Sequence, residues 1–208
     1  MICYFSATGN SRHVANRLAQ SLNESVTPVL DVLGKDVAVD DQMILVYPNY
    51  CGGVPSVIRE FLQKNIFRIK KNARLILVIT YGSNTGASAS IAAKYFKKNT
   101  GRTFDAMYSV KMPDNWTPVF DLTNADEVAE INRKADEEID GIIRKIKMGG
   151  GGDHVNDKLG KFIIVFGNVG AHTDAEAAFK GMLAAHQHDP ELVPDTLVVI
   201  VGGTVMQV

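Results

Sequence analysis

Cysteine is scarce in this sequence. Its 208 residues include two cysteines, Cys3 and Cys51, whereas an iron–sulfur cluster usually takes four thiolate ligands. We therefore expect no iron–sulfur cluster. Cys3 lies in an apolar run and Cys51 in a predicted loop, which favours two free thiols over a disulfide and favours a reducing compartment.

Long hydrophobic runs and a large net charge are also lacking. No apolar run reaches the roughly 18 residues of a membrane-spanning helix, so we expect no transmembrane segment. No charged stretch precedes the first predicted strand, so we expect no signal peptide and a cytoplasmic protein. The formal net charge of −1 predicts neither nucleic-acid nor membrane binding.

Hydrophobic residues make up 46% of the chain, enough for one domain with a sizeable core plus an extension. Charge is divided unevenly, because residues 1–150 carry a net +3 and residues 151–208 a net −4. A run of glycines at 149–152 follows the last clear amphipathic stretch. The predicted organisation is therefore a domain over residues 1–150 and an extension of uncertain structure over 151–208.

Short apolar runs alternate with longer amphipathic stretches, which is typical of an α/β protein. We predict strands at Ile2–Phe5, Val26–Leu30, Met43–Tyr47, Leu75–Thr80 and Ala106–Val110, and helices at Ser11–Leu22, Ser56–Ile66, Ser88–Lys98 and Asp126–Lys147. This order predicts a doubly wound, five-stranded parallel sheet with helices on both faces. In the extension, the pattern favours strands at Phe162–Phe166 and Leu197–Val201 and a helix at Asp174–His186.

Three predicted loops, at 6–11, 48–55 and 80–87, follow the carboxyl ends of strands, where open parallel sheets bind ligands. The first loop combines small residues, hydroxyls and a helix N-terminus, which together suit a phosphate group. It lacks the lysine of a Walker motif and the three-glycine spacing of a dinucleotide site. An ordinary capped turn uses the same residue types. The candidate phosphate ligands are Ser6, Thr8, Gly9, Asn10 and Ser11.

The second and third loops each combine glycine with an aromatic residue. Tyr50 and Tyr81 are candidates for packing on a flat ring, while the glycines permit unusual backbone angles. Plain strand-to-helix turns are the alternative for both loops. Together, the three loops describe a site for a flat heterocycle that ends in a phosphate. The further candidates for this site are Pro48, Asn49, Tyr50, Cys51, Gly52, Gly53, Thr80, Tyr81, Gly82 and Gly86.

The segment Tyr4-Phe-Ser-Ala-Thr-Gly-Asn-Ser11 resembles the FMN-phosphate loop of flavodoxins, with Ser11 where threonine is more usual. The segments at 47–55 and 110–116 resemble bacterial proteins that fuse a flavodoxin domain to a ferredoxin domain. This resemblance, over roughly residues 1–160, implies FMN, a flavodoxin-like fold and electron transfer. In such proteins the C-terminal half carries cysteine-rich cluster motifs, but no cysteine follows Cys51. A different extension, a natural truncation and read-through of another frame all remain open for the tail.

Three functions remain open from the sequence. The first is an FMN-binding electron carrier whose partners are a reductase or a ferredoxin-type donor or acceptor. The second is an FMN-dependent NAD(P)H:quinone-type reductase, and the third is a binding module without redox chemistry. Ser6 and Ser11 lack a visible histidine–acid partnership, so we expect no nucleophilic serine and no catalytic residue. We expect no metal at His172, His186 and His188, and Trp116 either covers the flavin edge or anchors its own loop.

Overall fold

The structure is a computed structural model. It describes residues 1–50, 52–114 and 122–156, together with the backbone of 162–166, 197–201 and 204–207. The chain divides into two compact units, Met1–Lys158 and Leu159–Val208, and each is described by itself. Cys51, Trp116 and the predicted helix at Asp174–His186 lie outside the described residues, as do His172, His186 and His188.

A parallel sheet forms the centre of the first unit. Its strands run in the order β2-β1-β4-β6-β7-β8, and all five neighbouring pairs are parallel. The bounds are β1 (Ile2–Tyr4), β2 (Val26–Pro28), β4 (Gln42–Pro48), β6 (Arg74–Tyr81), β7 (Ala106–Lys111) and β8 (Gly152–His154). All five predicted strands are present. The short edge strand β8 adds a sixth, which the sequence did not predict because its residues Gly-Asp-His carry no apolar pattern.

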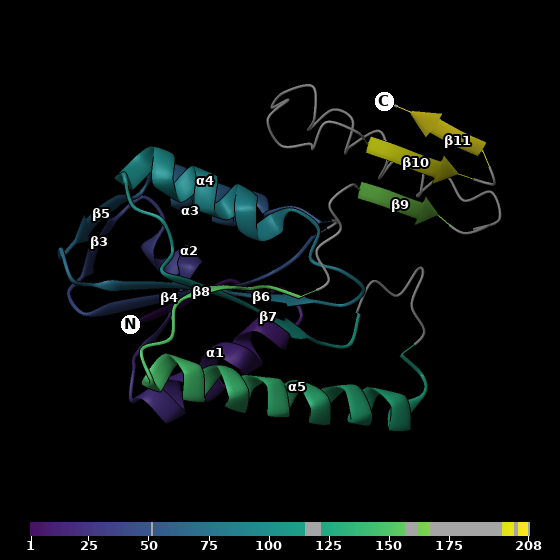
Figure 1. Ribbon diagram of the computed structural model, residues 1–208, viewed down its shortest axis with the longest axis horizontal. Coiled ribbons are helices and arrows are strands. Elements are labelled where there is room, and N and C mark those ends of the chain that lie inside the picture. Colours follow the sequence, from purple (N-terminus) through teal and green to yellow (C-terminus); the bar gives the residue numbers. More distant parts are fainter. Residues whose placement is uncertain (51, 115–121, 157–161, 167–196, 202–203, 208) are drawn as a thin grey trace. The chain divides into compact units, whose positions relative to one another are not determined.

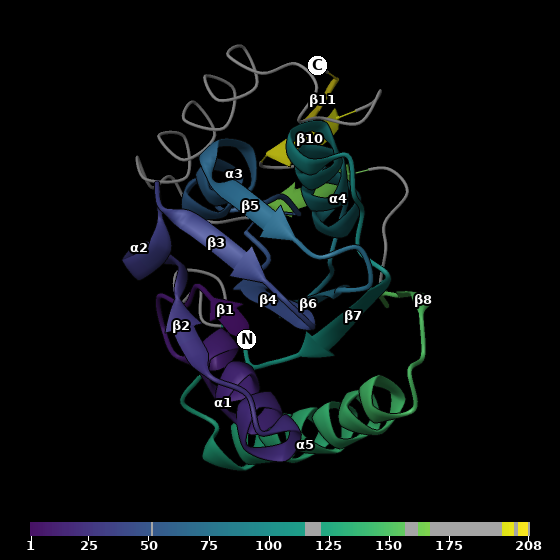
Figure 2. The ribbon, with the colours of Figure 1, turned by 90° about the vertical axis from the view of Figure 1, so that its left-hand side faces the viewer.

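Four helices cover the two faces of this sheet, as Figures 1 and 2 show: α1 and α5 lie on one face, and α3 and α4 lie on the other. Their bounds are α1 (Asn10–Leu22), α3 (Ser56–Lys64), α4 (Ser88–Thr100) and α5 (Ala125–Lys147). These are the four predicted helices. Asn124 begins α5 as its N-cap, because its side chain accepts a hydrogen bond from the Glu127 backbone N–H.

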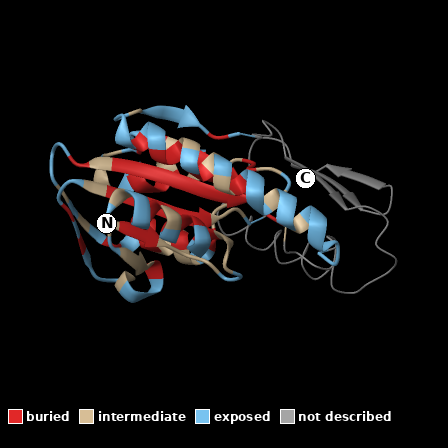
Figure 3. Cartoon of the chain, turned by 90° about the horizontal axis from the view of Figure 1, so that it is seen from below, coloured by how far each residue is buried: buried red, intermediate tan, exposed pale blue. Residues whose placement is uncertain are grey.

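Alternating apolar positions explain the core. Val14 and Leu18 of α1 pack with Ile139 and Ile143 of α5 against the central strands, where Ile44 is fully buried. Figure 3 shows the burial concentrated in the sheet, with the exposed residues on the outer helix faces. Cys3 lies in the buried strand β1, and burial raises the pKa of its thiol to about 11. A thiol with so high a pKa is a poor nucleophile.

Three short elements were missed by the sequence analysis: α2 (Val29–Val32), β3 (Asp36–Val39) and β5 (Ile66–Ile69). The strand predicted at Val26–Leu30 ends at Pro28, where α2 takes over. β3 and β5 pair in parallel as a separate two-stranded sheet. Phe67 of β5 packs edge-on against Phe61 of α3 and Phe96 of α4, with centroid distances of 5.2 and 5.1 Å. Contacts distant in sequence therefore hold this pair.

The second unit contains β9 (Phe162–Phe166), β10 (Leu197–Val201) and β11 (Thr204–Gln207), in the order β11-β10-β9. β9 and β10 are parallel, and β10 and β11 are antiparallel. Both strands predicted in the extension are present, and β11 is additional. In the described part of the chain, no helix combines the length and apolarity needed to cross a membrane.

Candidate functional site

The sheet reverses its winding between β1 and β4. The connection through α1 leads from β1 to β2 on one side, whereas β6 lies on the other side of β4. Doubly wound sheets bind ligands at this point, beyond the carboxyl ends of the strands. Loops 5–9 and 49–55 follow these two strands, and loop 82–87 follows the neighbouring β6.

The first loop leaves donors available at the start of α1. Gly9 is the N-cap residue with φ of 111°, and no side chain caps the helix. The first-turn N–H groups of α1 are therefore not consumed by a cap, and the first turn contains no acidic residue. Ser6 Oγ accepts a hydrogen bond from the Gly9 backbone N–H at 3.1 Å, which leaves the hydroxyl proton of Ser6 for a ligand. Thr8 is exposed beside this turn.

The sequence predicted Ser11 and Thr80 as cofactor ligands, but their hydroxyls bond to each other. The two oxygen atoms lie 2.7 Å apart in a buried hydrogen bond, and both residues are almost fully buried. This bond joins the start of α1 to the end of β6. These two side chains therefore stabilise the loops from within the core. The group of Ser11 that a ligand can use is its backbone N–H.

A tight turn forms the second loop. Tyr50 and Gly53 exchange two backbone hydrogen bonds, of 3.3 and 2.9 Å, and Gly52 between them has φ of 76°. A residue with a Cβ atom resists that angle. The Gly52 carbonyl accepts a hydrogen bond from the Ala87 backbone N–H at 3.0 Å, which connects this turn to the third loop. Pro48 lies directly before the turn at the end of β4, and Gly86 of the third loop also has positive φ, 52°.

The two predicted ring-packing tyrosines differ in accessibility. Tyr50 is 45% exposed and lies edge-on to Phe5, with ring centroids 6.4 Å apart. Partial burial raises the pKa of its phenol. Tyr81 is 5% exposed, so its side chain lies in the core instead of on the loop surface. Tyr50 is therefore the aromatic side chain of this pair that a ligand can reach.

Two asparagines connect the second and third loops, and both keep a buried atom unpaired. Asn49 Nδ2 donates to the Asn84 carbonyl oxygen at 2.7 Å. Asn49 Oδ1 and Asn84 Oδ1 are buried and accept no hydrogen bond from the described residues. Buried amide oxygens are nearly always paired, so these two fit a ligand with N–H donors. The sequence analysis missed Asn84, which stands beside candidate residues but carries no motif of its own.

A fourth segment, residues 112–114 after β7, also reaches the site. The Pro113 carbonyl oxygen accepts a hydrogen bond from Asn10 Nδ2 at 3.0 Å. Asp114 Oδ2 accepts one from Ser83 Oγ at 3.1 Å. Residues 112–114 were part of a segment noted for its resemblance, but none of them was among the predicted site residues.

The chemistry of this edge is that of binding and orientation. Across the described ranges, no three histidine, cysteine, aspartate or glutamate side chains are grouped so that they hold a metal ion. The donors and acceptors here are backbone N–H and carbonyl groups, hydroxyls, amides and the Asp114 carboxylate. Such groups are suited to binding a phosphate and a polar ring edge.

Comparison with known proteins agrees with this description. The family model described as a flavodoxin domain matches residues 1–140. No curated protein matches the sequence. Among solved structures, the two-electron reduced flavodoxin of Megasphaera elsdenii is 20% identical, with a TM-score of 0.38, over 65% of this chain and 97% of that one.

Another solved structure, the rubredoxin oxygen:oxidoreductase of Desulfovibrio gigas, is 12% identical with a TM-score of 0.39. The match covers 67% of this chain but only 35% of that protein, so the chain spans about a third of its length. The family match extends over two thirds of the sequence, from β1 into α5. The chain therefore belongs to the flavodoxin domain family.

Proposed function

We propose that the domain over residues 1–150 binds FMN without a covalent bond and exchanges single electrons with redox partner proteins, a reductase or a ferredoxin-type donor or acceptor. The observation that carries this proposal is the pair of buried, unpaired amide oxygens, Asn49 Oδ1 and Asn84 Oδ1, beside an uncapped helix N-terminus. One feature suits the N–H edge of a flavin ring, and the other suits its phosphate.

The phosphate end of FMN fits the first loop. The first-turn N–H groups of α1 and the hydroxyls of Ser6 and Thr8 would donate to its oxygens, and the partial positive charge of the helix N-terminus would favour its negative charge. This loop is built for a single terminal phosphate and has no lysine or pyrophosphate fingerprint. These features favour FMN over FAD and over a dinucleotide.

The ring end of FMN fits the second and third loops. The amide oxygens of Asn49 and Asn84 would accept from N–H groups of the ring, and Tyr50 would pack against its face. Flavin supplies the capacity to take and give electrons one at a time or in pairs. The loops at the sheet edge would hold the ring where a redox partner protein could approach it.

An absorption spectrum of the purified full chain tests the proposal directly. We expect a yellow protein with one FMN per chain, and mass spectrometry of the released ligand should give the mass of FMN. FAD as the dominant species would overturn the choice of cofactor, and a colourless chain that ignores added FMN would overturn the function. Iron and sulfide should be absent.

The role of the bound flavin is tested next. We expect reduction by NADPH only when a partner reductase is added. Steady oxidation of NADPH by the purified chain alone, with a quinone as acceptor, would instead favour an FMN-dependent NAD(P)H:quinone-type reductase.

A further inference from the structure

After α5 the chain returns to the sheet. Arg74 of β6 donates to the carbonyl oxygens of Ile146 and Gly150 at 2.8 and 2.9 Å, which holds the turn that follows the helix. β8 then pairs in parallel with β7, and the ring of His154 stacks on that of Tyr108 with centroids 5.2 Å apart. The predicted extension therefore begins as an edge strand of the same sheet, although the family match has already ended at residue 140.

Asn156 follows this strand and connects two other segments through its backbone. Its N–H donates to Ser109 Oγ of β7 at 2.8 Å. Its carbonyl oxygen accepts a hydrogen bond from Thr85 Oγ1 at 2.9 Å. The preceding residue, Val155, is buried, so a packed side chain also holds this backbone in place. Asn156 thus joins β7 to loop 82–87.

Thr85 is the point at which this connection reaches the candidate site. Its side chain is fully buried, and its carbonyl oxygen accepts a hydrogen bond from the Ser88 backbone N–H at 3.2 Å. The loop is therefore fixed at Thr85 by Asn156 on one side and by the start of α4 on the other. Asn84, directly before Thr85, carries one of the two buried, unpaired amide oxygens. The direction of that oxygen depends on how the backbone of Thr85 is held.

We infer that residues 151–156 form part of the cofactor site, and that Thr85 and Asn156 are positioning residues for the flavin ring; the inference rests on the proposed function. A loop that is ordered before its ligand arrives binds more tightly, because less conformational freedom is lost on binding. Two hydrogen bonds in series, Ser109 to Asn156 and Asn156 to Thr85, keep Asn84 oriented towards the ring. The series includes no residue of the first loop, so its effect is confined to the ring end of FMN.

Flavin binding to the full chain tests this role. Thr85→Val removes the hydroxyl but keeps the shape, and the dissociation constants of FMN and riboflavin, measured by fluorescence titration, should both rise about fivefold. Thr85→Ser keeps the hydroxyl and should bind both flavins as the wild type does. A loss for FMN alone would place the effect at the phosphate and overturn the inference.

Thr100→Val is the matched control. It removes a threonine hydroxyl that donates to the Phe96 carbonyl oxygen at 2.8 Å, at the opposite end of α4 from the third loop. It should lower the free energy of unfolding in urea and leave both dissociation constants unchanged. Equal increases in the dissociation constants of Thr100→Val and Thr85→Val would show a general effect of stability and overturn the inference.

A double variant tests whether the two hydrogen bonds act in series. Ser109→Ala removes the acceptor of the Asn156 N–H and should weaken the binding of both flavins. Added to Thr85→Val, it should cause no further loss, whereas additive losses would overturn the series. The visible circular dichroism of the bound flavin, recorded at saturation, should change in Thr85→Val and Ser109→Ala and stay unchanged in Thr100→Val, because it reports the surroundings of the ring and not the stability of the protein.

The outcomes also keep the two proposals apart. If Thr85→Val does not fold, Ser109→Ala decides the inference by itself. A wild-type chain that binds no flavin overturns the proposed function, and this inference with it. A wild-type chain that binds FMN, with equal dissociation constants in Thr85→Val and Ser109→Ala, overturns this inference alone.

Discussion

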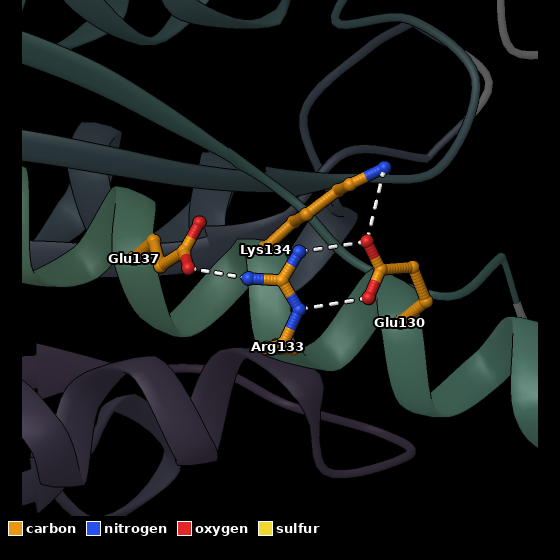
Figure 4. A network of polar contacts seen from close by, with 4 residues as sticks. All are labelled: Glu130, Arg133, Lys134 and Glu137. Carbon is orange, nitrogen blue, oxygen red and sulfur yellow. Dashed lines mark hydrogen bonds and ion pairs between the residues drawn. The ribbon is translucent and has the colours of Figure 1, made fainter.

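The exposed face of α5 and the edge formed by the strand-end loops differ in how their polar side chains are paired and buried. On α5, Arg133 forms ion pairs with Glu130 and Glu137, and Lys134 forms one with Glu130 (Figure 4). At the loop edge, charges are almost absent, yet Asn49 and Asn84 each bury an oxygen atom without a partner. The four charged residues of the α5 network are paired and exposed, whereas the neutral edge is partly buried and incompletely paired.

This difference shows which polar groups indicate function. Ion pairs between exposed side chains spaced three and four residues apart are common on helices and contribute little, because water and salt screen them. An unpaired buried amide costs free energy, so a folded protein keeps one only for a reason. The neutral loops are therefore the surface that we propose for ligand binding, although the α5 network has the larger electrostatic effects on its own members.

The largest effect is expected where a side chain faces a charged ligand group. Thr8→Ala removes an exposed hydroxyl from the phosphate loop, and losing a donor to a charged oxygen costs about 1.5–3 kcal/mol of binding free energy. FMN affinity, measured by fluorescence titration, should fall accordingly. Riboflavin lacks the phosphate and should bind both forms equally. Thr8→Ser, which keeps the hydroxyl, is the control, and equal losses for FMN and riboflavin would contradict the assignment.

A buried hydroxyl pair below the loops should matter for stability instead of for binding. Ser11→Ala leaves the Thr80 hydroxyl without the partner it has at 2.7 Å, which costs about 1–3 kcal/mol of the free energy of unfolding. Adding Thr80→Val removes the orphaned group and should recover part of that loss. Urea denaturation measures both. Additive losses in the double variant would show that the two hydroxyls do not depend on each other.

Alanine substitution of the two glycines of the second loop should change the free energy of unfolding by different amounts. Gly52 has φ of 76°, so Gly52→Ala should cost about 1–2 kcal/mol of the free energy of unfolding. Gly53 does not have positive φ, and a Cβ atom there would meet the Tyr50 carbonyl oxygen at an ordinary 3.5 Å, so Gly53→Ala is the matched control with a small effect.

The same pair of variants tests whether this turn responds to the redox state of the flavin. If a peptide of the turn moves when the ring takes up one electron, Gly52→Ala lowers the first one-electron potential at saturating FMN. Unchanged first potentials in both variants would leave the glycines as purely structural residues.

The smallest effect is expected on α5. The hydrogen bond that Arg133 donates to the Glu130 carboxylate lowers the pKa of Glu130 to about 2, from the ordinary value of 4.5. A lowered pKa in the folded state stabilises the protein above about pH 4.5, and this contribution is lost as the pH falls towards 2. Because the group is exposed, Glu130→Gln should change the urea midpoint only slightly at pH 7, and less still at pH 3 or in 1 M salt. A large loss that persists in high salt would break the comparison between the two surfaces.

Strong periodic patterns made much of the fold predictable. The buried runs at 43–47 and 75–80 and the regular apolar spacing in 126–147 lie where β4, β6 and α5 were found. The pair β3 and β5 was missed because its two strands are 26 residues apart and are held by Phe67 between two helices. β8 was missed because three residues with no apolar side chain become a strand only when β7 offers them a partner.

At the site, the sequence by itself determined which loops meet, because the carboxyl ends of parallel strands share one edge. It also determined that these loops are small, polar and without charge. Only the tertiary structure decided the direction of each side chain: Ser11 and Thr80 bond to each other, Tyr81 is buried, and Tyr50 is exposed. It also brought Asn84 and Asp114 to the site. Those outcomes depend on contacts between residues far apart in the chain, and no local pattern of residues encodes them.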